Sequence, residues 1–114
     1  MKKKTLISSL LIAMTIVSSS LVANAAASGD GIATGGFKAS MAGSQAINTA
    51  FTSTPSNISN YCTAKFSGYT SYERQSSVNY GYSSVTAYAP TGAYYGAYGQ
   101  HSYSYNGPKQ FFSR

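Results

Sequence analysis

Residues 80–88 read Tyr-Gly-Tyr-Ser-Ser-Val-Thr-Ala-Tyr and alternate between two kinds of side chain. The even positions carry tyrosines or hydroxyl groups, whereas the odd positions are mostly small. Because successive side chains of a strand point to opposite faces, this period of two predicts a β-strand. One face of the strand is rich in tyrosine, and the other can lie close to a second layer of the protein.

The chain is expected to turn directly after this strand, at residues 89–92, which read Ala-Pro-Thr-Gly. Proline fixes its own φ and cannot donate a hydrogen bond within a central sheet ladder. Residues 93–105 alternate again, so we predict that they return as the second strand of a hairpin. Residues 61–72 show the same alternation and predict a further strand, which a polar connection follows at residues 73–77.

These strands predict an all-β fold, either a small antiparallel β-sandwich or a single curved sheet. Small side chains on one face let a second sheet approach closely, while each tyrosine supplies a large ring with a hydroxyl. Large aliphatic residues are scarce outside the first 25 residues. A fully buried large apolar side chain contributes about 1.5–3 kcal/mol, and so few of them only roughly offset the ordering entropy. We therefore expect marginal stability or a homo-oligomer.

Residues 26–60 consist mostly of Ala, Gly, Ser, Thr and Asn, and little in them can fill a core. Within this part, residues 47–53 fit either a strand or a short helix, because the segment is too short for its period to decide. We therefore predict a flexible arm over residues 26–60, with a weak strand or short helix in it. A Tyr-rich antiparallel β domain follows over residues 61–114.

Residues 1–25 have the three parts of a secretory signal peptide. Three lysines follow Met1, residues 6–22 are largely apolar, and residues 23–25 form the small-x-small cleavage site Ala-Asn-Ala. Ser and Thr interrupt the apolar stretch, which disfavours the alternative of a retained membrane anchor. We expect the mature protein to be secreted into the extracellular space and to meet a membrane only during export.

Removal of the signal peptide leaves 89 residues, in which five Lys or Arg residues stand against Asp30 and Glu73. With a single His and a single Cys, this inventory argues against paired catalytic carboxylates, a Ser-His-acid triad and a metal site within one chain. We predict that the protein is not an enzyme and holds no cofactor or metal. His101 lies on a predicted strand and is expected to be a partly exposed sheet residue.

Cys62 is the only thiol of a chain that we expect to be exported. In a strand beside Ala64 and Phe66 it fits a small buried hydrophobe. An odd cysteine in a secreted protein also fits an intermolecular disulfide, which would join two copies of the chain.

Tyrosine rings favour interfaces and can stack on sugars, and a net positive charge favours anionic polymers. The basic residues are spread along the chain and form no patch, so we predict no nucleic-acid partner. The predicted function of this mildly cationic protein is therefore binding of a cell-envelope component or glycan. The candidate surface-binding residues are Tyr80, Tyr82, Tyr88, Tyr94 and Tyr98.

A second function fits the same composition. Strands that are rich in Tyr, Ser, Gly and Gln are prone to cross-β stacking. The alternative is therefore a self-assembling structural protein that forms fibrils in an extracellular matrix.

The signal peptide, the short mature part and the aromatic strands at residues 80–88 and 93–98 together resemble the lactococcin 972 family of secreted bacteriocins. The resemblance covers about the last 45 residues and consists of alternation, without a diagnostic motif. It implies a small antiparallel β-sandwich, export by the general secretory route and an antibacterial action on the envelope of competing bacteria. The chain departs from the family in having no Trp, and Cys62 matches no family position. No functional residue carries over.

Overall fold

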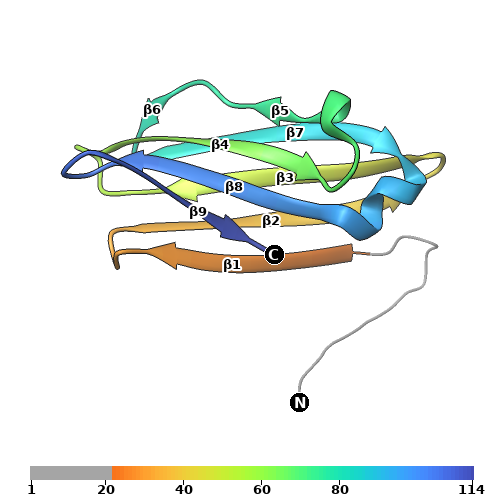
Figure 1. Ribbon diagram of the computed structural model, residues 1–114, viewed down its shortest axis with the longest axis horizontal. Coiled ribbons are helices and arrows are strands. Elements are labelled where there is room, and N and C mark those ends of the chain that lie inside the picture. Colours follow the sequence, from red (N-terminus) through yellow and green to blue (C-terminus); the bar gives the residue numbers. More distant parts are fainter. Residues whose placement is uncertain (1–21) are drawn as a thin grey trace, which may run out of the picture.

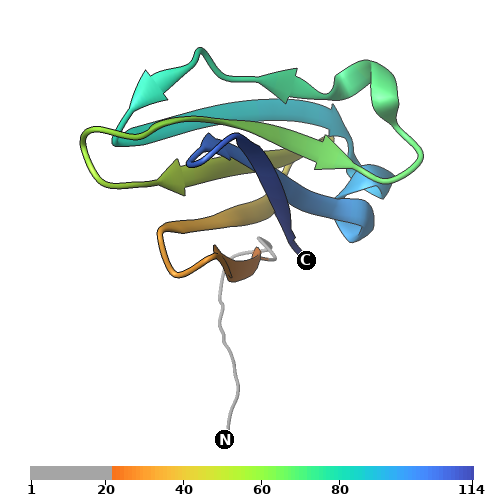
Figure 2. The same cartoon turned by 60° about the vertical axis from the view of Figure 1, so that its left-hand side comes forward.

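The computed structural model describes residues 22–114, which form two antiparallel β-sheets packed face to face (Figure 1, Figure 2). Residues 1–21 of the predicted signal peptide lie outside the described residues. Sheet A has the order β1-β2-β3-β7, with β1 (Val22–Gly29), β2 (Ala33–Ala42), β3 (Gln45–Ser53) and β7 (Tyr82–Pro90).

Sheet B has the order β5-β4-β8-β9, and β6 also pairs with β4. Its strands are β4 (Ser59–Phe66), β5 (Arg74–Gln75), β6 (Asn79–Tyr80), β8 (Ala97–Ser104) and β9 (Pro108–Ser113). Two 3₁₀ helices complete the fold, with η1 (Thr70–Tyr72) before β5 and η2 (Thr91–Gly96) between β7 and β8.

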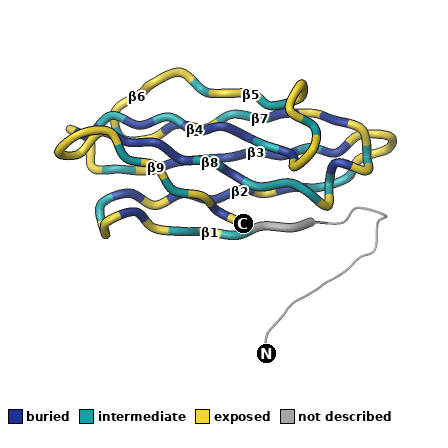
Figure 3. The backbone as a smooth tube through the Cα atoms, in the orientation of Figure 1, coloured by how far each residue is buried: buried dark blue, intermediate teal, exposed yellow. Residues whose placement is uncertain are grey.

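The predicted all-β fold is confirmed, and of its two forms the structure adopts the sandwich. Sheet A presents mainly small side chains to the core, whereas sheet B contributes the larger Phe66 and His101. Figure 3 shows the buried stretches along β3, β4 and β8 at the centre of the molecule. Small residues let the two sheets approach closely. The fully buried alanines of sheet A are Ala33, Ala39, Ala46, Ala50 and Ala87.

Asn48 fastens the two sheets to each other across this core. Its side chain comes from β3 and is fully buried. The Nδ2 group donates to the carbonyl oxygens of Lys65 and Tyr98, each at 2.9 Å, on the two central strands of sheet B. A buried polar group is costly unless it is hydrogen-bonded, so these two bonds specify how β3 sits over β4 and β8.

Residues 26–60 are not a flexible arm, and that prediction is wrong. In sheet A, β2 and β3 are the two central strands and pair along their lengths. Of the two alternatives left open at residues 47–53, the structure shows the strand, as the main part of β3. Small residues fill little core volume themselves, but closely packed sheets require such residues at their interface. Residues 26–60 and 61–114 therefore share one sandwich.

Residues 82–90 and 97–104 are strands, but they do not form the predicted hairpin. Instead β7 pairs with β3, where Tyr88 lies opposite Ile47, and β8 pairs with β4 in the other sheet. The connection is the 3₁₀ helix η2, which carries the chain from sheet A to sheet B and buries Ala93 in the core. A tight turn would have kept both strands in one sheet, whereas this connection crosses between the two sheets.

The strand predicted at residues 61–72 ends at Phe66. Gly68 then adopts a φ of +79°, which costs glycine little, and the chain turns into η1. At the other end of the protein, β1 begins inside the predicted signal peptide. Residues 22–25 pair with residues 37–40 of β2. Removal of a signal peptide stays a prediction.

Candidate functional site

The outward side of sheet B brings side chains of several kinds together. On β8, Tyr98, Gln100 and Ser102 alternate with buried residues and so point away from the core. Their neighbours on β4 and β9 follow from the register of the antiparallel pairs. We call this surface face B, and it consists of Tyr61, Lys65, Tyr98, Gln100, Ser102, Gln110, Phe112 and Arg114.

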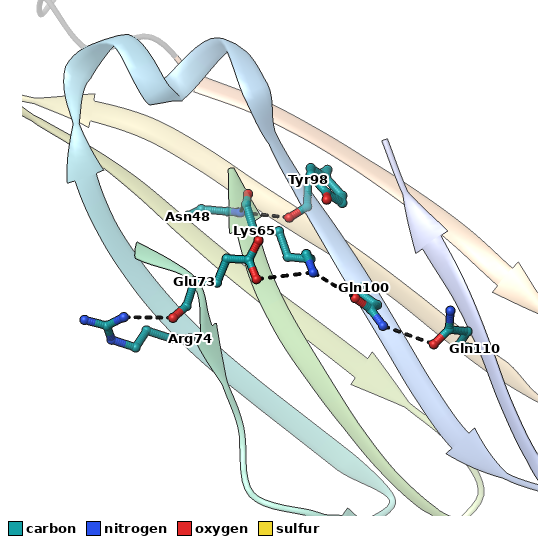
Figure 4. Close-up of polar contacts among 7 residues, drawn as sticks. All are labelled: Asn48, Lys65, Glu73, Arg74, Tyr98, Gln100 and Gln110. Carbon is teal, nitrogen blue, oxygen red and sulfur yellow. Dashed lines mark hydrogen bonds and ion pairs between the residues drawn. The ribbon is translucent and has the colours of Figure 1, made fainter. Parts of the chain in front are cut away.

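A row of polar contacts crosses face B from β4 to β9 (Figure 4). Lys65 Nζ lies 3.3 Å from Glu73 Oε1 and donates to Gln100 Oε1 at 3.1 Å. Gln100 Nε2 in turn donates to Gln110 Oε1 at 3.1 Å. An amide has two donors and two acceptor lone pairs, so each glutamine is oriented by the row and still has hydrogen-bonding capacity for a ligand.

Arg114 lies over two aromatic rings at one end of face B. Its Cζ atom is 4.7 Å from the ring centroid of Tyr98 and 4.9 Å from that of Phe112. The two rings are themselves in contact, with centroids 6.2 Å apart. A guanidinium at these distances gains cation–π attraction from each ring, which holds its plane in place.

A pocket of about 350 Å³ opens at the other end of face B. Ser102, which is 6% exposed, lies between Tyr61 of β4 and Gln110 of β9 in the strand register. Val78 and Pro108 add apolar surface to the lining. The volume is near the lower end of the roughly 300–1,000 Å³ typical of small-molecule pockets, and the mixed lining suits a small amphipathic group.

The five candidate tyrosines are distributed over several surfaces. Tyr82 and Tyr88 are exposed on the outer side of sheet A, and Tyr80 is exposed at the edge of sheet B. Tyr94 lies in η2, half-buried against the core, and burial, with a further contribution from neighbouring Tyr95, raises the pKa of its hydroxyl. Only Tyr98 belongs to face B. A binding role for each of the five stays a prediction.

Cys62 is a free thiol that is fully buried between the sheets. Its Sγ atom lies 3.4 Å from the carbonyl oxygen of Ala50, to which it is a weak donor. Burial raises the pKa of this thiol, and hydrogen bonds with Ser76 and Thr52 offset part of the effect. This burial agrees with the interpretation of Cys62 as a small buried hydrophobe, and the intermolecular disulfide stays a prediction.

His101 is also fully buried, so the expectation of partial exposure is wrong. Its Nδ1 atom lies 2.9 Å from Thr52 Oγ1, and its Nε2 atom lies 2.8 Å from Ser113 Oγ. Desolvation lowers the pKa of the imidazole to about 4. A hydroxyl beside an imidazole is the first half of a nucleophile–base pair, but both hydroxyls here are fully buried. The cluster instead links β3, β8 and β9.

Sequence reasoning placed Tyr98 on a binding surface but missed Gln100, Gln110 and Arg114. The alternation of residues 93–105 does put Tyr98 and Gln100 on the same side of one strand, so a signal for Gln100 was present. No such signal existed for residues of β9, because their position beside β8 depends on the pairing of the strands.

Comparison of the sequence with models of known protein families gives no match, and comparisons with curated proteins and with solved structures give none either. Within residues 22–114, no helix is long and apolar enough to cross a membrane. The same range contains no group of three or more His, Cys, Asp or Glu residues that could hold a metal ion.

Proposed function

We propose that the protein binds a glycan of the cell envelope or of the extracellular surroundings through face B. The observation that carries the proposal is that hydrogen-bonded glutamine side chains, two aromatic rings and a pocket lie on the same surface of one sheet. A sugar ring has apolar C–H faces and a periphery of hydroxyls. Such a ring can lie against an aromatic side chain while amides and cations bind its hydroxyls.

The proposal is also supported by the contacts that orient the side chains of this surface. Strands hold its residues, and Lys65 and Gln110 orient Gln100 from both sides. A ligand therefore does not have to order flexible side chains, which otherwise costs about 0.5–1.5 kcal/mol for each immobilised side chain. Preorganised polar groups favour binding of a glycan, because a glycan has little apolar surface to bury.

The sequence supports a location outside the producing cell. A signal peptide is predicted, and the remaining chain carries a small net positive charge that favours anionic envelope polymers. The resemblance to secreted bacteriocins adds a finer proposal, in which binding to the envelope of competing bacteria harms them.

The binding proposal is tested by cosedimentation of the purified protein with insoluble bacterial cell walls and with insoluble polysaccharides. We expect retention by at least one of these materials, and reduced retention of the double variant Gln100→Ala, Gln110→Ala. Gln45→Ala is the matched control, because Gln45 is exposed at the start of β3 in sheet A. Absence of retention on every material, or equal loss in the control, would contradict the proposal.

The antibacterial proposal requires a separate measurement. Purified protein is added to growing cultures of several bacteria, and viable cells are counted beside the same concentration of the double variant. Killing by the original protein alone supports a bacteriocin-like action. Retention on walls without killing would leave glycan binding as the function and would remove the antibacterial part.

One observation favours the alternative of self-assembly. At an edge of sheet A, β7 is a nine-residue strand with no charged side chain, and such edges can pair with another chain. Ser84→Lys places a charge on this edge strand, and Ser53→Lys places one on the neighbouring β3. Under this alternative, concentrated protein forms dye-binding fibrils, and Ser84→Lys suppresses them more than Ser53→Lys. A protein that stays monomeric would remove it.

A further inference from the structure

The charges of the described residues are unevenly distributed between the two sheets. Of the five Lys and Arg residues in residues 22–114, only Lys38 belongs to sheet A. The others are Lys65, Arg74, Lys109 and Arg114, all in sheet B or directly after it. The two acids of this range neutralise Lys65 and Lys109, which lie 3.3 Å from Glu73 and 3.4 Å from Asp30, respectively. Among the side chains of face B, one positive charge is therefore left without an ion pair.

The guanidinium of Arg114 is this unpaired side chain. Among residues 22–114, Arg114 forms no ion pair, and its guanidinium is held against Tyr98 and Phe112. Its guanidinium carbon lies over the two rings, and the group carries five N–H donors. A planar fork of donors fits a carboxylate or phosphate with two parallel hydrogen bonds.

The pocket lies further along the same strand. Ser102, in its lining, follows Tyr98 by four residues on β8, which corresponds to about 14 Å. Gln100 lies between them and points to the same side. A single sugar ring cannot reach both the pocket and Arg114, but consecutive units of a chain can.

We propose that the ligand is an anionic oligosaccharide, with one sugar ring in the pocket and an acidic group of another unit bound by Arg114. Gln100 and Gln110 bind hydroxyls of the oligosaccharide between the ring in the pocket and the acidic group. This assignment rests on the proposed glycan-binding function and specifies the class of glycan. The acidic group is a carboxylate or a phosphate, and both present the oxygens that the guanidinium recognises.

The first test compares ligands of equal length by calorimetry with purified protein. A hexamer of a uronic acid, its uncharged methyl ester and a phosphorylated neutral hexamer are titrated. We expect both anionic ligands to bind at least roughly tenfold more tightly than the ester, because hydrogen bonds with charged groups are the stronger ones. The anionic ligand that binds more tightly then identifies the acidic group as a carboxylate or a phosphate. Equal affinity for all three ligands would overturn the proposal.

The second test separates Arg114 from the general positive charge. Arg114→Gln should lower affinity for the anionic hexamer by roughly tenfold and leave affinity for the methyl ester unchanged. Arg74→Gln is the matched control, because Arg74 is exposed on β5 and bonds to the carbonyl oxygens of Ser71 and Glu73. It should change affinity by less than about threefold, as a surface charge does. Equal losses in both variants would overturn the role of Arg114.

The third test addresses the pocket. Val78 is 62% exposed, so a polar residue there leaves the core intact. Val78→Asp should weaken binding of the anionic hexamer more than Val78→Asn, because only the first adds a repelling charge. If neither variant changes the affinity, the pocket is not part of the site. Retention on cell walls without any preference for anionic hexamers would overturn this inference alone, while the broader glycan proposal would stand.

Discussion

The imidazole of His101 occupies the interior of the sandwich without a charged partner. Thr52 and Ser113 provide one hydroxyl at each ring nitrogen, and Phe111 lies alongside with its ring centroid at 5.0 Å. A neutral imidazole needs one donor and one acceptor, which two hydroxyls can supply. A protonated ring would have to remain in the same desolvated position, so burial favours the neutral form.

This arrangement predicts that the fold loses stability in acid. The pKa of His101 is lowered to about 4 in the folded state, against about 6.5 in an unfolded chain. Between these values the unfolded chain binds a proton that the folded protein does not, so stability rises with pH and is complete above about 6.5. We expect a loss of about 3 kcal/mol from pH 6.5 to pH 4 in urea unfolding experiments.

The variant His101→Gln serves as the control for this prediction. Its amide keeps one donor and one acceptor for the two hydroxyls but does not titrate. The pH dependence between 4 and 6.5 should therefore largely disappear, although the variant is less stable at every pH. A variant that keeps the full dependence would assign it to other groups.

At the level of strands, alternation predicted the conformation of residues 82–90 correctly but not their partner. A strand with a small-residue face can pair with any strand of the same pattern, and β7 pairs with β3 instead of β8. Residues 26–60 were misread for a related reason. Alanine at a sandwich interface and alanine in a linker cannot be told apart in the sequence. At the interface, the small side chain of alanine lets the opposite sheet approach, and this depends on the fold.

The hydrogen bonds of Asn48 predict the strength of the link between the sheets. Asn48→Ala removes two donors and leaves the carbonyls of Lys65 and Tyr98 without them, at a cost of about 2–4 kcal/mol in unfolding free energy. Thr49→Ala on the same strand loses only the outward bond to Thr86 and should cost less than about 1 kcal/mol. Urea unfolding of both variants tests this. Similar costs would mean that Asn48 contributes no inter-sheet bond.

For the molecule as a whole, the reactivity of the Cys62 thiol reports whether the two sheets separate. This thiol is buried by both sheets and has a raised pKa, so a thiol reagent can reach it only when the sandwich separates. We expect slow labelling in buffer, fast labelling in urea and identical gel migration with and without reductant. Rapid labelling of the folded protein, or a dimer that reductant dissolves, would contradict the buried position.

Face B shows why the candidate site was harder to predict than the fold class. Tyr98 and Gln100 share a side of one strand, and this the alternation indicates. Arg114 and Gln110 join them only through the pairing of β9 with β8. A surface built across strands depends on contacts between distant segments, whereas a surface along one strand can be read from a single stretch of chain.

The position of β1 gives the predicted cleavage site a consequence for the timing of export. The bond after Ala25 lies in the middle of an eight-residue strand, with residues 22–25 paired to residues 37–40. A peptidase needs an unpaired, extended substrate, so a precursor that folded first would conceal this bond. If a peptidase does cleave after Ala25, we expect cleavage to precede folding. The processed protein would then retain half of β1, and four residues of β2 would have no neighbour on that side.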